Sequence, residues 1–181
     1  MEALHRGWRA LALATGVALL LGGPPPDQGT FPERERQLSF YHTHTGQQLD
    51  VVYWRDGRYV PAELARVDRF LSDFRTGDVV EIDPALLDLI HDVQSLVGGG
   101  TYEVISAYRS PATNEMLRRR GATSGVAEKS QHLHGKAIDV RLQGVPTAEL
   151  RDAAITLGRG GVGYYAASDF VHMDTDRVRH W

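Results

Sequence analysis

Residues 130–140 read SQHLHGKAIDV and bring two histidines and a carboxylate close together. The whole chain of 181 residues contains 8 histidines, so this grouping stands out. The overlapping segment KAIDVRL (136–142) alternates small or apolar residues with polar ones, which predicts a β-strand. Asp139 and Ala137 share one face of such a strand, and the small Ala137 leaves room for a metal ion beside the carboxylate. Gly135 lets the backbone turn just before the strand.

A second strand-like segment, FVHMD (170–174), supplies a further candidate ligand. Its alternation puts His172 on one strand face and the neighbouring valine and methionine on the other. Catalytic zinc sites take three protein ligands from histidine and carboxylate side chains and keep a fourth position open for water. His132, Asp139 and His172 match that ligand set by residue type, so the two segments together indicate a metal site.

Spacing alone leaves a purely structural interpretation of these residues open. His132 and His134 would then be solvated loop histidines. Asp139 would pair with a nearby arginine such as Arg141, and His172 would lie in the core. Both interpretations are compatible with the positions of these residues in the sequence.

The composition excludes several classes of function. The formal net charge of −3 gives no basic footprint for nucleic acid, and the basic run 118–120 is typical of a solvated helix C-terminus. The absence of cysteine excludes disulfides, thiolate catalysis, iron–sulfur clusters and cysteine zinc sites. With 42% hydrophobic residues, the chain can bury the core of a single domain. We expect a monomer without a nucleic-acid partner.

The N-terminal segment predicts export. Two arginines precede an apolar run of twelve residues, ALALATGVALLL (10–21), and glycines and prolines follow it, which is typical of a secretory signal peptide. Such a run is shorter than the ~20 residues that span a bilayer. We interpret residues 1–23 as a signal peptide or a retained N-terminal anchor, which would then be the sole membrane contact. Residues 24–37 are predicted to be a linker and residues 38–181 the folded domain, acting in the periplasm or cell envelope.

The order of predicted elements indicates an α+β fold. Turn signals between β-branched and aromatic residues predict an N-terminal β-hairpin in residues 38–60. Helices are predicted at 62–75, 84–97, 111–120 and 147–157, and strands at 102–108, 136–142, 161–165 and 170–174. We expect a small antiparallel sheet that carries the metal site, with the helices packed on one side. His42 and His44 in the hairpin are expected to face solvent, and Asp174 is expected to pair with Arg177.

The motifs together resemble the zinc D-alanyl-D-alanine peptidase family. S-x-H-x-x-G-x-A-x-D occupies residues 130–139, a strand carrying His172 follows about thirty residues later, and YRSP (108–111) lies upstream. This family shares its fold with the lysostaphin-type endopeptidases and the hedgehog signalling domain. The resemblance is closest to the murein endopeptidase branch and extends over residues 38–181, including THTG, GVGYY and FVHMDTDRVRHW.

The resemblance implies that His132, Asp139 and His172 hold one Zn²⁺ ion. Two neutral imidazoles and one carboxylate leave such a site with a net positive charge, which lowers the pKa of a bound water toward ~7. The resulting hydroxide would attack a peptide carbonyl. Arg109 would stabilise the oxyanion or bind a substrate carboxylate.

The resemblance leaves the general base open. Asp169 stands three positions before His172, where the carboxypeptidase members of the family carry an acidic residue, but the tryptophan that flanks that acid is absent here. His134 is the alternative base or oxyanion donor. Ser130 and Gln131 are expected to contact the substrate or the zinc ligands.

The implied function is a zinc-dependent murein endopeptidase that hydrolyses peptide cross-links in peptidoglycan. A D,D-carboxypeptidase of the same family is one alternative. A non-catalytic zinc-containing module that binds the cell wall is another, and it would gain support if no base reached the zinc-bound water.

Overall fold

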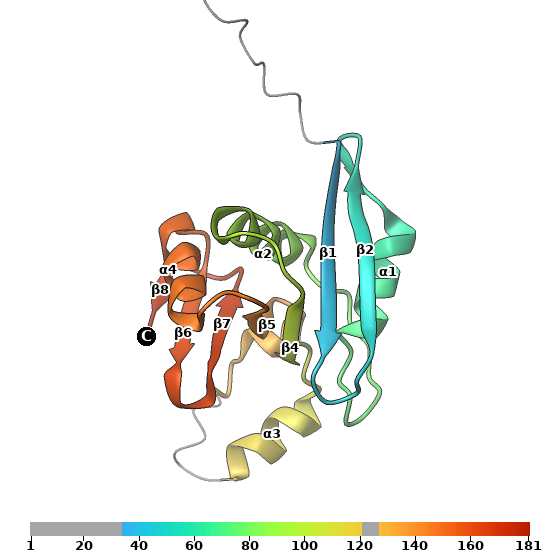
Figure 1. Cartoon of the computed structure of the whole chain (residues 1–181). Helices are drawn as coiled ribbons and strands as arrows, with labels where there is room; N and C mark the ends of the chain where they lie inside the picture. The colour runs from blue at the N-terminus through green and yellow to red at the C-terminus, as the bar shows by residue number, and fades with distance from the viewer. Residues whose placement is uncertain (1–33, 121–126) are drawn as a thin grey trace, which may run out of the picture. The chain divides into compact units, whose positions relative to one another are not determined.

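The computed structural model describes residues 34–120 and 127–181 (Figure 1). The predicted leader, 1–23, and most of the predicted linker lie outside these residues. Within the described ranges, no helix has the length and apolar character needed to cross a bilayer.

The described residues form four α-helices and one sheet of eight strands. The elements, in chain order, are β1 (Glu35–His42), β2 (Gln48–Arg55), β3 (Arg58–Tyr59), α1 (Pro61–Phe70), α2 (Pro84–Val97), β4 (Tyr102–Ser106), α3 (Pro111–Arg119), the 3-10 helix η1 (Gln131–His134), β5 (Ala137–Leu142), α4 (Thr147–Leu157), β6 (Gly161–Tyr165), the 3-10 helix η2 (Ala166–Ser168), β7 (Phe170–Asp174) and β8 (Arg179–His180). The fold is therefore α+β, as the sequence predicted. Strand β1 begins at Glu35, inside the segment predicted as linker, because Glu35 already pairs with Arg55 on β2.

The sheet is mixed, whereas the sequence predicted an antiparallel one. Its strand order is β3-β2-β1-β4-β5-β7-β6-β8. The β1–β4 and β6–β8 pairs are parallel, and the other neighbours are antiparallel. Parallel neighbours require a long crossover connection, and α1 and α2 supply it between the N-terminal strands and β4. Periodicity alone does not distinguish the two pairings.

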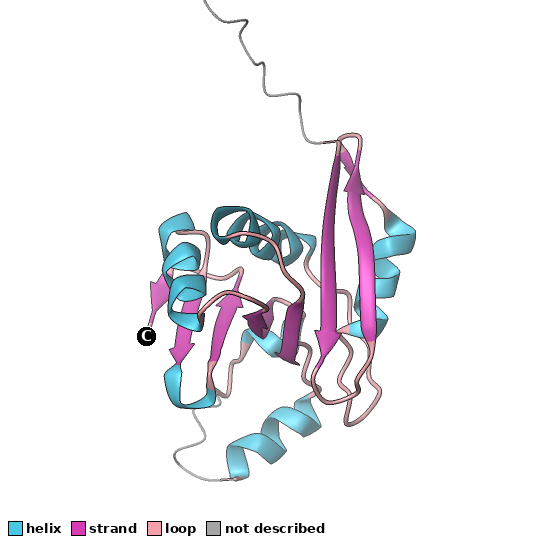
Figure 2. Cartoon of the chain, viewed as in Figure 1, coloured by secondary structure: helices cyan, strands magenta, loops and turns pink. Residues whose placement is uncertain are grey.

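Helices α2 and α4 pack against each other and against the strands, while α1 packs on β2 (Figure 2). Helix α2 starts where Asp83 accepts a hydrogen bond from the backbone of Ala85, with Pro84 in the first turn, as the sequence predicted. Its buried stripe is Leu86, Leu87, Leu89, Ile90 and Val93. This stripe joins the apolar side chains of the central strands in one core.

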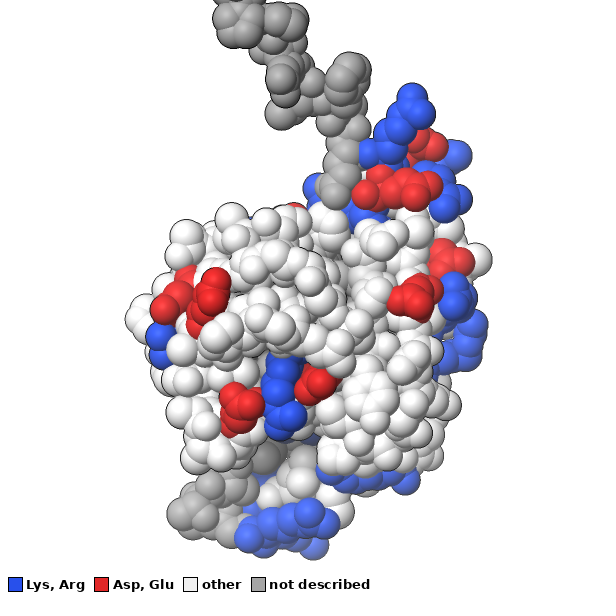
Figure 3. All heavy atoms as spheres, viewed as in Figure 1, with Lys and Arg blue, Asp and Glu red and all other residues white. Residues whose placement is uncertain are grey.

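The basic run after Met116 ends α3, as expected. Arg118 and Arg119 both bond Glu115 on the same helix, and Arg118 also approaches Glu128. Figure 3 shows lysine and arginine side chains gathered at the end of the molecule where α3 lies. The local acids offset part of this charge.

Candidate metal centre

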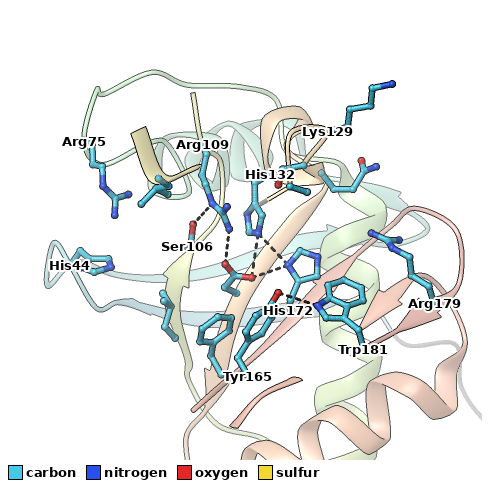
Figure 4. A pocket seen from close by; sticks show the side chains of 17 residues that line it. His44, Arg75, Ser106, Arg109, Lys129, His132, Tyr165, His172, Arg179 and Trp181 are labelled. Atoms are coloured by element: carbon cyan, nitrogen blue, oxygen red, sulfur yellow. Dashed lines mark hydrogen bonds and ion pairs between the residues drawn. The ribbon is translucent and has the colours of Figure 1, made fainter. Parts of the chain in front are cut away.

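Three side chains from separate elements converge at the centre of the sheet. His132 comes from η1, and Asp139 and His172 lie directly opposite each other on β5 and β7. His132 Nε2 lies 3.2 Å from His172 Nδ1 and 3.2 Å from Asp139 Oδ1, and the two latter atoms are 2.8 Å apart (Figure 4). All three residues are buried. Among the described residues, this is the one group of histidine and acidic side chains placed to hold a metal ion.

Gly135 positions η1 against the sheet. Its φ of 64° lies in the left-handed region, which favours glycine. A Cβ atom at this position would meet the carbonyl oxygen of Glu81 at 2.5 Å, and the Gly135 carbonyl itself accepts a hydrogen bond from Asp83. The glycine predicted as a turn is therefore also a point of close backbone approach, which holds His132 beside the sheet.

Hydrogen bonds on the far side of each imidazole decide which nitrogen faces the centre. His132 Nδ1 lies 2.6 Å from the carbonyl oxygen of Ala107, which can only accept, so Nδ1 carries the proton. His172 Nε2 lies 2.8 Å from Asp174, so this nitrogen donates to the carboxylate. With neutral imidazoles, Nε2 of His132 and Nδ1 of His172 then point lone pairs at each other and at Asp139.

Three acceptor atoms that face one another require a cation between them. Burial lowers the pKa of His132, which favours its neutral, ligand-competent form. Burial opposes ionisation of Asp139, but the two imidazoles beside this carboxyl outweigh burial and hold its pKa below the usual range, so Asp139 is an anion. Ligands at ~2.0–2.2 Å from a tetrahedral zinc ion lie roughly 3.4 Å apart. Two of the observed separations, at 3.2 Å, are close to that spacing, and the third, at 2.8 Å, would lengthen by about 0.6 Å around the ion, so these residues fit zinc.

Asp174 holds the outer nitrogen of His172 in place. This carboxylate is fully buried and also accepts from the backbone of Gly161 and from Arg179, whose Nη2 lies 2.7 Å away. Burial would raise the pKa of Asp174, but the hydrogen bonds from His172 and Arg179 lower it overall. The expected partner, Arg177, is not the one found, since Arg179 on β8 takes that place.

Arg109 holds the other oxygen of Asp139. Its Nη2 donates to Asp139 Oδ2 at 2.9 Å, and its Nε donates to Ser106 at 3.0 Å. Asp139 therefore pairs with Arg109, and the alternative partner Arg141 is excluded. The backbone beside Arg109 is fixed by Asp73, which accepts from the Ser110 amide at 2.8 Å.

A cleft of about 250 Å³ opens over these atoms. Figure 4 shows Arg75 and His44 at one end of it and Tyr165 and Trp181 at the other. Arg75 and Lys129 line the cleft and have no ion-pair partner among the described residues. The cleft therefore combines a buried metal-ligand set with unpaired positive charge, which suits a substrate that carries carboxylates.

The family model described as peptidoglycan L,D-endopeptidase MepK matches residues 31–181. The chain belongs to this family. The MepK proteins of Escherichia coli K12 and Shigella flexneri are each 40% identical to it over 172 residues, covering 93% of this chain and 91% of the relative. The probable peptidoglycan L,D-endopeptidase MepK of Haemophilus influenzae is 37% identical over 179 residues, covering 97% and 94%. No solved structure gave a significant match. The family expected from the sequence motifs is thus confirmed.

Neither predicted base lies near the ligand group of this MepK-family chain. Asp169 sits in the left-handed turn before β7, with φ 51°, and its carboxylate accepts from Thr147 at 2.7 Å. This turn directs the side chain away from the cleft. His134 lines a different surface hollow, next to Lys136. Within the described part of the chain, Asp139 is the one carboxylate that lines the cleft.

The other predicted site residues do reach the cleft, together with some that the sequence did not indicate. Ser130 and Gln131 line it beside His132. His44 also lines it and stacks on Phe74 at 4.4 Å between ring centroids.

The two hairpin histidines, expected to share a solvated face, differ. His42 is buried, whereas His44 is exposed. Alternation within GVGYY could have placed Tyr165 on the face of the metal site, but nothing in the sequence pattern indicated Arg75 or Trp181.

Proposed function

We propose that this chain is a zinc-dependent L,D-endopeptidase that hydrolyses peptide cross-links in peptidoglycan. Its family and its relatives in three bacteria carry peptidoglycan L,D-endopeptidase in their names, and the match extends over nearly the whole of each relative. The single observation that carries the zinc assignment is the convergence of three lone pairs from His132, Asp139 and His172 under an open cleft.

The chain's own residues prepare the site. Zn²⁺ bound there would supply a Lewis acid and a water of lowered pKa. The Ala107 carbonyl and Asp174 bind the outer nitrogens of His132 and His172 and so orient the inner nitrogens toward the site. Two neutral imidazoles and one carboxylate would leave the centre net positive. Arg109 orients Asp139 and has further N–H groups for the substrate carbonyl or carboxylate.

We further propose that the protein is exported and works as a monomer in the periplasm or cell envelope. Residues 1–23 would serve as a cleaved signal or a retained anchor, and residues 24–34 would link them to the folded domain. Peptidoglycan lies outside the cytoplasmic membrane, so export is required for contact with this substrate.

A non-catalytic module that binds the cell wall is the second candidate. The observation in its favour is that neither Asp169 nor His134 lines the cleft. A peptidase without these bases needs another group to take up the proton of the attacking water, because general-base catalysis requires hydrogen-bond reach.

Digestion of purified muropeptide dimers distinguishes these functions. We expect the zinc-loaded protein to convert L,D-cross-linked dimers to monomers, to stop after chelation and to resume after zinc is added back. D,D-cross-linked dimers are the matched control and should remain intact. Release of terminal D-alanine alone would instead indicate a carboxypeptidase. Binding of peptidoglycan without any cleavage would indicate the binding module.

A further inference from the structure

Tyr165 lies beside the metal-ligand group on the same face of the sheet. Gly163 pairs with His172 across β6 and β7, and Tyr165 follows two positions later, opposite Phe170. Residues two apart on a strand point to the same face, so Tyr165 projects on the side of His172. Figure 4 shows Tyr165 and Trp181 next to His172, while Arg109 approaches the group from the other side.

The hydroxyl group of Tyr165 has a proton to donate. Trp181 Nε1 donates to the Tyr165 hydroxyl oxygen at 3.0 Å, and an indole N–H can only donate. The tyrosine oxygen is therefore the acceptor in this bond, and its own proton must point elsewhere. Within residues 34–120 and 127–181, no acceptor lies within hydrogen-bond distance of it. The free O–H belongs to a residue that lines the cleft.

The surrounding structure fixes this hydroxyl group. The Tyr165 ring stacks on Phe170 with centroids 4.6 Å apart and planes at 16°. The backbone of Trp181 pairs with β6 through Val162 and Tyr164. A Cβ atom on Gly163 would meet the Trp181 ring at 2.7 Å, so a glycine is needed there to admit the indole. A donor held in this way costs little reorganisation when charge develops beside it.

We propose that Tyr165 is a catalytic residue that donates a hydrogen bond to the oxyanion formed when the substrate carbonyl is attacked. This inference rests on the proposed peptidase function. The proton stays on the tyrosine throughout, so no bond of Tyr165 is made or broken. Arg109 and Tyr165 then flank the reacting carbonyl from opposite sides. Because a phenol binds an anion more strongly than a neutral carbonyl, the contact favours the transition state over the ground state.

The test is Tyr165→Phe, which keeps the stacked ring and removes the O–H group. We expect kcat on an L,D-cross-linked dimer to fall about 100-fold, the loss typical of one oxyanion donor, with KM changed less than about twofold. Zinc affinity, measured by competition with a chelator, should be unchanged. The matched control is Tyr164→Phe on the same strand, which points to the opposite face and should keep the wild-type kcat.

A Tyr165→Phe variant with the kcat of the wild type would overturn the inference. A loss of zinc affinity as large as the loss of kcat would also overturn it. Binding of a phosphinic peptide, a tetrahedral oxyanion analogue, separates the inference from the proposed function. A wild type that binds the analogue but cleaves no dimer contradicts the proposed function alone. A Tyr165→Phe variant that cleaves dimers and binds the analogue as tightly as wild type contradicts the role of Tyr165 alone.

Discussion

The two faces of strands β5 and β7 have opposite physical characters. One face presents Ile138, Val140, Val171 and Met173, all with no measurable exposure, to the helices. The other presents the polar groups of Asp139, His172 and Asp174, which are also buried. Burial of apolar surface stabilises the first face, whereas burial of charge destabilises the second unless every group is paired.

This difference assigns separate tasks to alternate residues of the same strands. The apolar face anchors the strands in the core, so the polar face can hold groups that would repel one another without a cation. Substitutions on the polar face should therefore change metal binding and activity, and substitutions on the apolar face should change stability.

The largest effect is expected for His172→Ala on the polar face. Loss of one of three ligands should lower the rate of dimer cleavage by at least about 10³-fold, which corresponds to about 4 kcal/mol. The fold should persist, because the apolar face is untouched and the two nearby carboxylates keep their arginine partners. Circular dichroism together with a cleavage assay tests this. An active variant would contradict the assignment of His172.

The next effect is expected for Ile138→Ala on the apolar face. Removing a fully buried side chain should lower the free energy of unfolding by about 3 kcal/mol. The folded fraction should retain wild-type zinc affinity and turnover. Urea unfolding measures the loss of stability. A zinc affinity that falls in proportion to stability would contradict the claim that the apolar face governs stability and the polar face governs metal binding.

A smaller effect is expected for Asp174→Asn. The variant removes the charge that holds the outer nitrogen of His172, and zinc affinity should fall about 10- to 100-fold. Asp176→Asn is the matched control, because this exposed acid also approaches Arg179 but does not contact His172. Chelator competition on both variants measures the difference. Equal affinities would show that Asp174 does not orient the ligand.

The smallest effect is expected for Asp73→Asn, at the border between core and cleft. Burial raises the pKa of Asp73, but hydrogen bonds from Thr113 and the backbone outweigh it and lower the pKa overall. A lowered pKa stabilises the fold above the usual aspartate range, and this contribution is lost as pH falls below about 4. At pH 7 we expect the free energy of unfolding of the wild type to exceed that of the variant by about 1.5 kcal/mol. Urea unfolding at pH 7 and below about pH 4 should show that this difference in stability shrinks in acid. A difference that stays constant would contradict the role of Asp73.

Both faces could be predicted from sequence because alternation is local. KAIDVRL and FVHMD each carry their polar and apolar residues at a period of two, and this pattern indicated Asp139 and His172 as candidate ligands. His132 lies outside both segments, and the resemblance to the zinc peptidase family completed the set. The parallel β1–β4 pairing could not be predicted, because it depends on how two helices cross over the sheet.

The remaining site residues depend on contacts that no short pattern contains. Asp169 has the sequence position expected of a base, but a left-handed turn sends its side chain to Thr147. The Tyr165 hydroxyl oxygen accepts a hydrogen bond from Trp181, which leaves the tyrosine's own proton free to donate. Trp181 reaches this position because its backbone pairs with β6 after a turn beyond β7. Such contacts join segments that are distant in the sequence, and a local period carries no information about them.

The most direct test is a zinc titration of metal-free protein in which bound zinc and the cleavage rate of an L,D-cross-linked dimer are measured on the same samples. The structure predicts that the rate rises in proportion to bound zinc and stops rising at one ion per chain. Cleavage at the full rate by metal-free protein, or tight zinc binding that survives His132→Ala and His172→Ala together, would contradict the assignment of the polar face as the metal centre.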